Sequence, residues 1–135
     1  MKKIILILVI IFAIAASVYY YTFVYSNTHH RDAQAETSIV ISADSLVAAY
    51  QANEQKANTI YLNKALEVTG PILSIDKDQA NHITILMGKA DAFSNVSITL
   101  LTNEPISQKV GEIITVKGVC TGNLSDVIIN EGVIK

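Results

Sequence analysis

The side chains that most often carry out chemistry are few in this chain and lie far apart in its sequence. Cys120 is the only cysteine, so a disulfide within the chain is excluded. A nucleophilic thiol requires a base or a cation that lowers its pKa, and the only histidine after residue 30 is His82. Around Cys120, polar and apolar residues alternate as they do in a strand. We therefore interpret Cys120 as a small apolar residue of the protein interior.

The candidate metal ligands lack the spacing that a metal site needs. His29 and His30 are adjacent in a polar stretch, and no further ligand follows at a definite interval. Asp76 and Asp78 lie in the stretch "DKDQAN", which lacks the series of oxygen ligands and the glycine of a calcium loop. This stretch has the composition of a turn, and His82 follows it as a surface or capping residue. The sequence predicts neither a metal site nor a cofactor.

A pair of carboxylates that could act as acid and base is missing as well. Asp126 and Glu131 are close in sequence, but side chains at that spacing on one strand point to opposite faces. The sequence contains no glycine-rich phosphate loop, no CxxC motif and no serine elbow. We predict that the protein is not an enzyme and has no catalytic residues.

The charge of the C-terminal part argues against strong attraction to nucleic acid. Between Glu36 and Lys135 the chain has seven lysines and eleven acidic residues, which gives a net charge of −4. Aromatic residues that could stack on bases are scarce in this part, namely Tyr50, Tyr61 and Phe93. We therefore expect a partner that is not a polyanion.

Residues 1–25 predict a membrane segment. Residues 4–24 contain no charge, and as an α-helix they would be roughly 31 Å long, close to the thickness of a bilayer's hydrocarbon core. Lys2 and Lys3 precede this run and Arg31 follows it, which favours a cytoplasmic N-terminus and an extracytoplasmic domain. We predict a single-pass transmembrane helix that contacts the lipid bilayer through residues 4–24. The alternative is a secretory signal, cleaved after the small-residue triplet at 13–15, which would also export the domain.

A polar segment and then a helix follow the membrane segment. Residues 26–41 begin with a polar stretch that lacks periodicity, and we interpret them as a tether. Ser42 can cap a helix through its hydroxyl, and apolar residues then recur at three- and four-residue spacing. We predict a helix over residues 43–60 with a break near Asn53, where a polar residue interrupts the apolar face.

From Ala65 onward the hydrophobic period changes from that of a helix to that of a strand. The first strand contains Gly70 and Pro71, and this pair predicts a bulge or a sharp bend inside it. A connector at residues 104–111 separates the third strand from the fourth. The predicted strands cover residues 65–75, 82–88, 95–102, 112–121 and 127–134.

One helix, three strands, a connector and two strands are the elements of a small Greek-key barrel. A glycine bend lets the first strand serve both halves of such a barrel, and closure of the sheet removes its exposed edges. We predict a mainly β fold over residues 42–135, an OB-fold barrel of five strands, with the preceding helix packed over one end or side.

OB barrels commonly bind ligands in the groove beside their second and third strands. Those strands lie within residues 82–101 here, and alternation directs Thr84, Leu86, Ser97 and Thr99 outward. These side chains are uncharged and small or apolar, which suits a protein, a peptide or an envelope glycan better than a polyanion. We predict a non-catalytic binding or scaffold module with these four residues as its ligand contacts.

The sequence also resembles a known family. The pieces that carry the resemblance are "VTG" at residues 68–70, "VKG" at 116–118 and "CTG" at 120–122, and the likeness extends over residues 42–135. They are similar to those of the tRNA_anti-like OB-fold proteins of bacteria, of which similar members begin with a lysine-started membrane segment. The resemblance implies the OB fold and a bacterial source. By analogy with anticodon-binding OB domains, it also implies nucleic-acid binding as the alternative function.

Overall fold

The computed structural model describes residues 2–25 and 34–135, which belong to two compact units divided after Asp32. The first unit contains the α-helix α1 (Lys2–Tyr19), which continues as the π-helix η1 (Tyr20–Tyr25). All described large apolar side chains between Ile7 and Phe23 are exposed, and Phe12 is 77% exposed. A helix that is apolar on every side has no polar face to turn toward water.

The membrane-spanning helix predicted over residues 4–24 is not found. Among residues 2–25 and 34–135, no helix is long and apolar enough to cross a membrane. The α-helix α1 ends at Tyr19, and its first two residues are Lys2 and Lys3.

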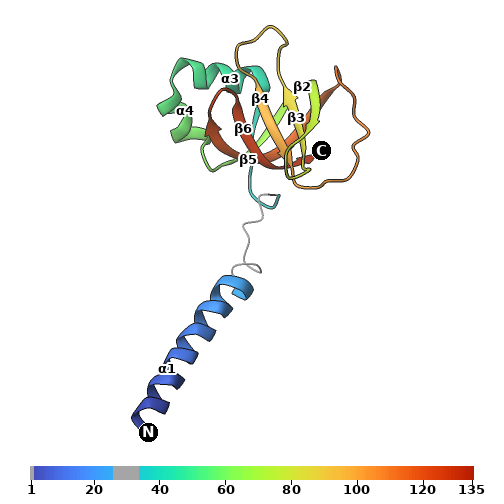
Figure 1. The fold of residues 1–135 in the computed structure, drawn as a ribbon. Helices are drawn as coiled ribbons and strands as arrows, with labels where there is room; N and C mark the ends of the chain where they lie inside the picture. The colour runs from blue at the N-terminus through green and yellow to red at the C-terminus, as the bar shows by residue number, and fades with distance from the viewer. Residues whose placement is uncertain (1, 26–33) are drawn as a thin grey trace. The chain divides into compact units, whose positions relative to one another are not determined.

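Five strands of the second unit close into a barrel (Figure 1). They are β2 (Ala65–Lys77), β3 (Ile83–Met87), β4 (Val96–Leu100), β5 (Ile113–Asn123) and β6 (Val127–Ile134). Their order around the barrel is β2-β3-β4-β6-β5, and pairing between β2 and β5 completes the circle. Within the barrel, β4 and β6 run parallel and all other neighbours run antiparallel. This is the Greek-key arrangement of the OB fold, so the predicted mainly β barrel is confirmed.

Two short helices, α3 (Ala43–Ala52) and α4 (Glu54–Tyr61), precede the barrel strands. The hydroxyl of Ser42 accepts a hydrogen bond from the backbone N–H of Ser45 at 3.2 Å and caps α3. Asn53 has an extended backbone, which ends α3, and its Oδ1 accepts from the backbone N–H of Lys56 at 2.9 Å to begin α4. The predicted cap at Ser42 and the predicted break near Asn53 are therefore confirmed.

Strand β2 takes part in both halves of the barrel because it changes partner in its middle. Residues Ala65–Pro71 pair with β5, and residues from Ile72 onward pair with β3. The change of partner follows Gly70 and Pro71, where the sequence predicted a bend. A methyl group on Gly70 would lie 2.9 Å from Cβ of Ala43, so glycine lets the start of α3 approach the strand closely.

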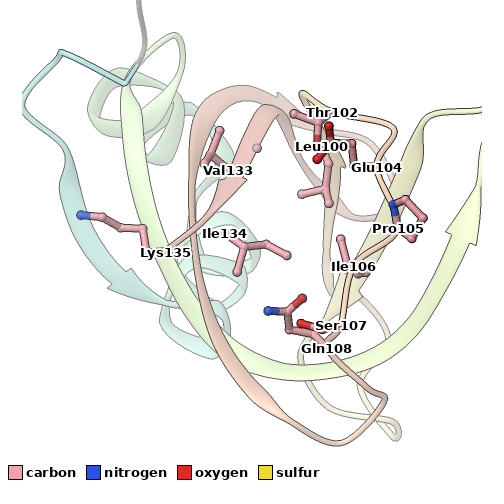
Figure 2. Close-up of a pocket in the computed structure, with 11 residues that line it drawn as sticks. Leu100, Thr102, Glu104, Pro105, Ile106, Ser107, Gln108, Val133, Ile134 and Lys135 are labelled. Atoms are coloured by element: carbon pink, nitrogen blue, oxygen red, sulfur yellow. The ribbon is translucent and has the colours of Figure 1, made fainter.

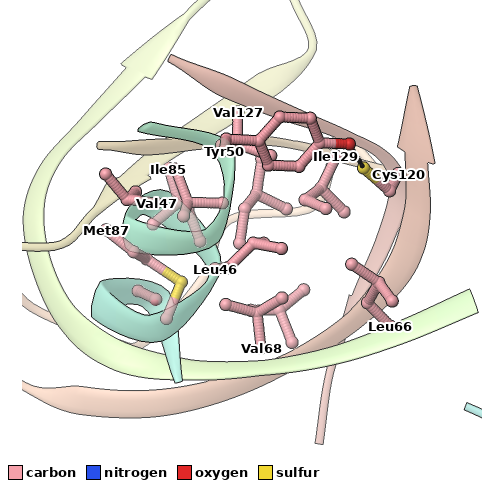
Figure 3. Close-up of a cluster of buried hydrophobic side chains, with 14 of the residues drawn as sticks. Leu46, Val47, Tyr50, Leu66, Val68, Ile85, Met87, Cys120, Val127 and Ile129 are labelled. Carbon is pink, nitrogen blue, oxygen red and sulfur yellow. Dashed lines mark hydrogen bonds between the residues drawn. The ribbon is translucent and has the colours of Figure 1, made fainter. Parts of the chain in front are cut away.

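Helix α3 packs against the barrel and contributes to its core (Figure 3). Leu46 is fully buried, Tyr50 is 4% exposed, and both belong to one core cluster with residues of every barrel strand. Full burial of one large apolar side chain stabilises a fold by about 1.5–3 kcal/mol, so α3 is an integral part of this domain. Cys120 is fully buried in the same cluster, and this confirms its interpretation as an interior residue.

A short strand ahead of α3 was not predicted. Strand β1 (Ile39–Ser42) pairs in parallel with the N-terminal half of β2, along the edge that β3 leaves free. The segment before β1 is held by Lys117, a buried lysine whose Nζ donates to the backbone carbonyls of Gln34 and Glu36 at 2.8 and 2.6 Å. We call residues 34–42 the strap. Most of the strap falls within the predicted tether of residues 26–41, although β-branched residues at 39–41 favour a strand.

Candidate binding surface

The four residues predicted as ligand contacts lie side by side on the outside of β3 and β4. Thr84 is paired across the strands with Thr99, and Leu86 is paired with Ser97. All four residues are half-buried, whereas the residues between them are buried in the barrel. The alternation of the two strands thus brings the four side chains together on one surface.

Strand β6 extends this surface beyond the predicted residues. It runs parallel to β4, with Ile128 opposite Ser97. Ile128 and Asn130 are half-buried and alternate with buried residues. These two residues are absent from the predicted ligand contacts because the pairing of β6 with β4 is a long-range contact, although their alternation with apolar residues indicates an outward direction. We define the outer face as Thr84, Leu86, Ser97, Thr99, Ile128 and Asn130, and none of these side chains is charged.

Carboxylates hold the loops at both ends of the outer face. Before β3, Oδ1 of Asp78 accepts hydrogen bonds from the backbone N–H groups of Ala80 and His82, each at 2.8 Å. The bond from His82 is the main reason that the pKa of Asp78 lies below its ordinary value. After β5, Oδ1 of Asp126 accepts from the backbone N–H of Asn95 at 2.7 Å. Negative charge therefore lies at both ends of the outer face. The hydrogen bonds of Asp78 stabilise the turn that was predicted at residues 76–81.

A pocket of about 380 Å³ lies where α4 meets the hairpin of β5 and β6. Ile128 belongs both to this pocket and to the outer face, so the two are continuous. We call this pocket between α4 and the β5–β6 hairpin the hairpin pocket. It is lined by Glu54, Asn58 and Leu62 from α4 and its end, and by residues 121–124 and Ile128 from the hairpin.

A second pocket, of about 360 Å³, lies between the connector after β4 and the ends of β4 and β6 (Figure 2). Ile106 and Ile134 face each other in this connector pocket, and polar residues of the connector line its rim. Lys135 also lines the pocket, but its Nζ lies 2.8 Å from Oε1 of Glu67. The lysine is thus already paired with a carboxylate, and the pocket offers little attraction to an anion.

Cys120, which was considered as a nucleophile, contacts a tyrosine in the core. Sγ of Cys120 lies 3.3 Å from the hydroxyl of Tyr50. Figure 3 marks this contact with a dashed line. Burial is the main cause that raises the pKa of Tyr50 above its ordinary value, so this phenol is neutral and cannot serve as a base for the thiol. Within residues 2–25 and 34–135, no three His, Cys, Asp or Glu side chains lie close enough together to hold a metal ion. His29 and His30 lie outside the described residues.

A profile of the tRNA_anti-like family matches residues 1–132 of this chain. The chain belongs to the tRNA_anti-like family. Among curated proteins, none matches this tRNA_anti-like chain.

Among solved structures, the tRNA_anti-like chain is similar to a lipoprotein of Klebsiella pneumoniae subsp. pneumoniae MGH 78578, named as a candidate nucleic acid-binding protein. The TM-score is 0.57 and the sequence identity 15%, over 79% of this chain and 99% of that chain. At this identity, the likeness shows that the tRNA_anti-like chain and the lipoprotein share a fold.

Proposed function

We propose that the barrel domain is a non-catalytic binding or scaffold module that holds its ligand on the outer face. The observation that carries this proposal is an uncharged surface between two loops that are each held by a carboxylate. Hydroxyls and the amide of this surface can form hydrogen bonds with a ligand, and Leu86 and Ile128 can exclude water from the contact. The ligand we propose is a protein, a peptide or a glycan of the bacterial envelope. No cofactor is needed to bind it.

The arrangement of the lysines makes nucleic acid the weaker candidate. Lys89 forms an ion pair with Asp44 at 3.1 Å, and Lys135 forms one with Glu67 at 2.8 Å. Lys117 is buried and donates to backbone carbonyls. These three cations would have to give up a partner before they could bind a phosphate, which lowers the electrostatic gain from a nucleic-acid backbone.

Nucleic-acid binding is nevertheless the second candidate, and Phe93 is the observation that favours it. Its side chain is 96% exposed in the loop between β3 and β4, where a base could stack on it. The similar Klebsiella lipoprotein has a name that points to the same class of ligand. Titration with single-stranded RNA and DNA at several salt concentrations tests this candidate. Tight binding with a steep salt dependence, lost in Phe93→Ala, would replace our first proposal.

We also propose that residues 4–24 bring the chain to a lipid bilayer and that the barrel domain is extracytoplasmic. The support is the uncharged sequence of this stretch, its exposed apolar side chains, and Lys2 and Lys3 ahead of it. The basic start, the apolar run and the small-residue triplet at 13–15 also fit a secretory signal, which would export the domain. A reporter enzyme that works only outside the cytoplasm, fused after Lys135, should be active. Activity of a cytoplasm-dependent reporter at the same position would refute this proposal.

Site-specific crosslinking in living cells tests the binding proposal on the full chain. A photoreactive residue in place of Thr99 should give discrete crosslinked products, and Ser97→Arg on the same chain should suppress them by placing a long cation on the outer face. A photoreactive residue in place of Ser107, which lines the connector pocket, is the control and should give none of these products. Digestion of the products by a protease or by a glycan hydrolase identifies the class of partner. Equal products from both positions, or none from Thr99, would refute the proposal.

A further inference from the structure

The hairpin pocket contains two hydrogen-bond acceptors on one face of α4. Glu54 and Asn58 are about one helical turn apart, and both line the pocket. Oδ1 of Asn58 is shielded from solvent and has no hydrogen-bond partner among residues 2–25 and 34–135. A donor in the pocket can reach this acceptor once the Asn58 side chain rotates, and the acceptor has no existing hydrogen bond to give up.

Glu54 supplies the only charge among the residues that line the hairpin pocket. Its carboxylate forms no ion pair within the described part of the chain, where the pairs involve Asp44, Glu67 and Asp78. No lysine or arginine lines the pocket and could compete for it. A cationic ligand is therefore complementary to this pocket, and an anionic one is not.

The remaining wall of the hairpin pocket is apolar. Leu62 and Ile128 are half-buried, and Leu124 at the turn of the hairpin is 83% exposed. Gly122 has a φ of +115°, and a methyl group placed on it would lie 3.6 Å from Cδ1 of Leu62. The positive φ favours glycine at this position of the hairpin, and the 3.6 Å distance is an ordinary van der Waals contact. An apolar stem of a ligand can lie along this wall and bring its polar end to the two acceptors.

We propose that the hairpin pocket binds an arginine side chain presented by a partner peptide or protein. The methylene stem contacts the apolar wall, and the guanidinium donates to the carboxylate of Glu54 and to Oδ1 of Asn58. Arginine suits two acceptors of different kinds because its planar head carries five N–H donors, whereas a lysine ammonium is a compact point charge. This inference rests on the proposed function. It selects a peptide or protein among the proposed ligands, since Ile128 joins the pocket to the outer face.

Nuclear magnetic resonance of the full chain, labelled with nitrogen-15 in a zwitterionic detergent, tests this proposal. The probe is Nα-acetyl-arginine methylamide, added up to about 50 mM to cover the millimolar dissociation constants expected of a single side chain. It should shift the side-chain amide of Asn58 and the backbone N–H of Gly122 in a saturable way. The matched citrulline compound keeps the shape of the probe but lacks its charge, and it should bind at least about tenfold more weakly.

Two substitutions separate recognition by the pocket from a general charge effect. Glu54→Gln should weaken binding of the arginine probe at least about tenfold, whereas Glu104→Gln in the connector pocket should leave it unchanged. Asn58→Leu provides a second variant if the spectrum of Glu54→Gln shows a change of fold, and it should also weaken binding. Absence of saturable shifts, equal binding of the citrulline compound, or unchanged binding in both pocket variants would overturn the proposal.

The outcomes for the pocket and for the outer face are distinguishable. If the arginine probe gives no response while the crosslinks at Thr99 persist, the pocket proposal fails and the binding module stands. If the probe binds at the pocket but Thr99 gives no crosslinks, the proposed function of the outer face fails instead.

Discussion

Replacing Asn58 by leucine should make the protein more stable. Oδ1 of Asn58 is shielded from solvent and has no donor within the described part of the chain. A buried polar group without a partner costs about 1–3 kcal/mol, and leucine of similar shape removes that cost. Leucine also favours the interior of a helix over asparagine by a few tenths of a kcal/mol. The residue as a whole is only half-buried, so lost hydration of its amide nitrogen offsets part of the gain.

We expect a net stabilisation of about 1–2 kcal/mol from Asn58→Leu. Urea unfolding followed by circular dichroism should show a midpoint higher by roughly 1 M, with an unchanged slope. Gln55→Leu is the matched control, because Gln55 is an exposed residue of the same helix, and it should change stability by less than about 0.5 kcal/mol.

A stability of Asn58→Leu equal to or below that of the parent protein would refute the reasoning. It would mean that Oδ1 already has a partner, such as an ordered water molecule, in the free protein. If the variant is instead more stable and no longer binds the arginine probe, Asn58 lowers stability while it serves binding, as expected of a site residue.

Three further substitutions test the fold. Gly118→Ala should destabilise the protein by about 1–3 kcal/mol in urea unfolding, because the new methyl group would lie 2.6 Å from Cγ2 of Ile129. Lys117→Met removes the donor that holds the strap, and limited proteolysis should cut the strap faster than in the parent protein, with no change in cleavage of the connector. Hydrogen bonds, first from Lys135, lower the pKa of Glu67 below its ordinary 4.5, so its ionised form contributes stability that is lost as pH falls through that lowered value. Glu67→Gln should therefore flatten the decline of the urea midpoint between about pH 5 and pH 3, and an unchanged decline would contradict this assignment.

The barrel could be predicted because its signals are local. Alternation defines each strand from a few neighbouring residues, and Gly70 with Pro71 marks the bend of β2 within the same stretch. The cap at Ser42 and the break at Asn53 depend on residues within one helical turn. Such signals give the order of the helices and strands. Few barrel topologies are compatible with that order, so the order is enough to predict the fold.

The features that sequence reasoning missed depend on contacts between distant residues. Strand β1 pairs with β2, which begins more than twenty residues later, and its own four residues are too few for a period to be read. Ile128 was omitted from the ligand contacts because only the parallel pairing of β4 with β6 places it beside Ser97. Asn58 was read as part of an ordinary helix, since the hairpin that encloses its pocket comes more than sixty residues later.

Strand β1 has a consequence for any form of this protein that is shortened from its N-terminus. It covers the stretch of β2 between Leu66 and Thr69 on the side that no barrel strand occupies. Removal of the chain up to Ser42 would leave unpaired N–H and C=O groups there, ready to accept a strand from another molecule. Proteolytic cleavage within the strap would therefore expose an edge of β2 on which further molecules could add strands. Cleavage ahead of Gln34 would leave β1 paired with β2 and the strap bonded to Lys117.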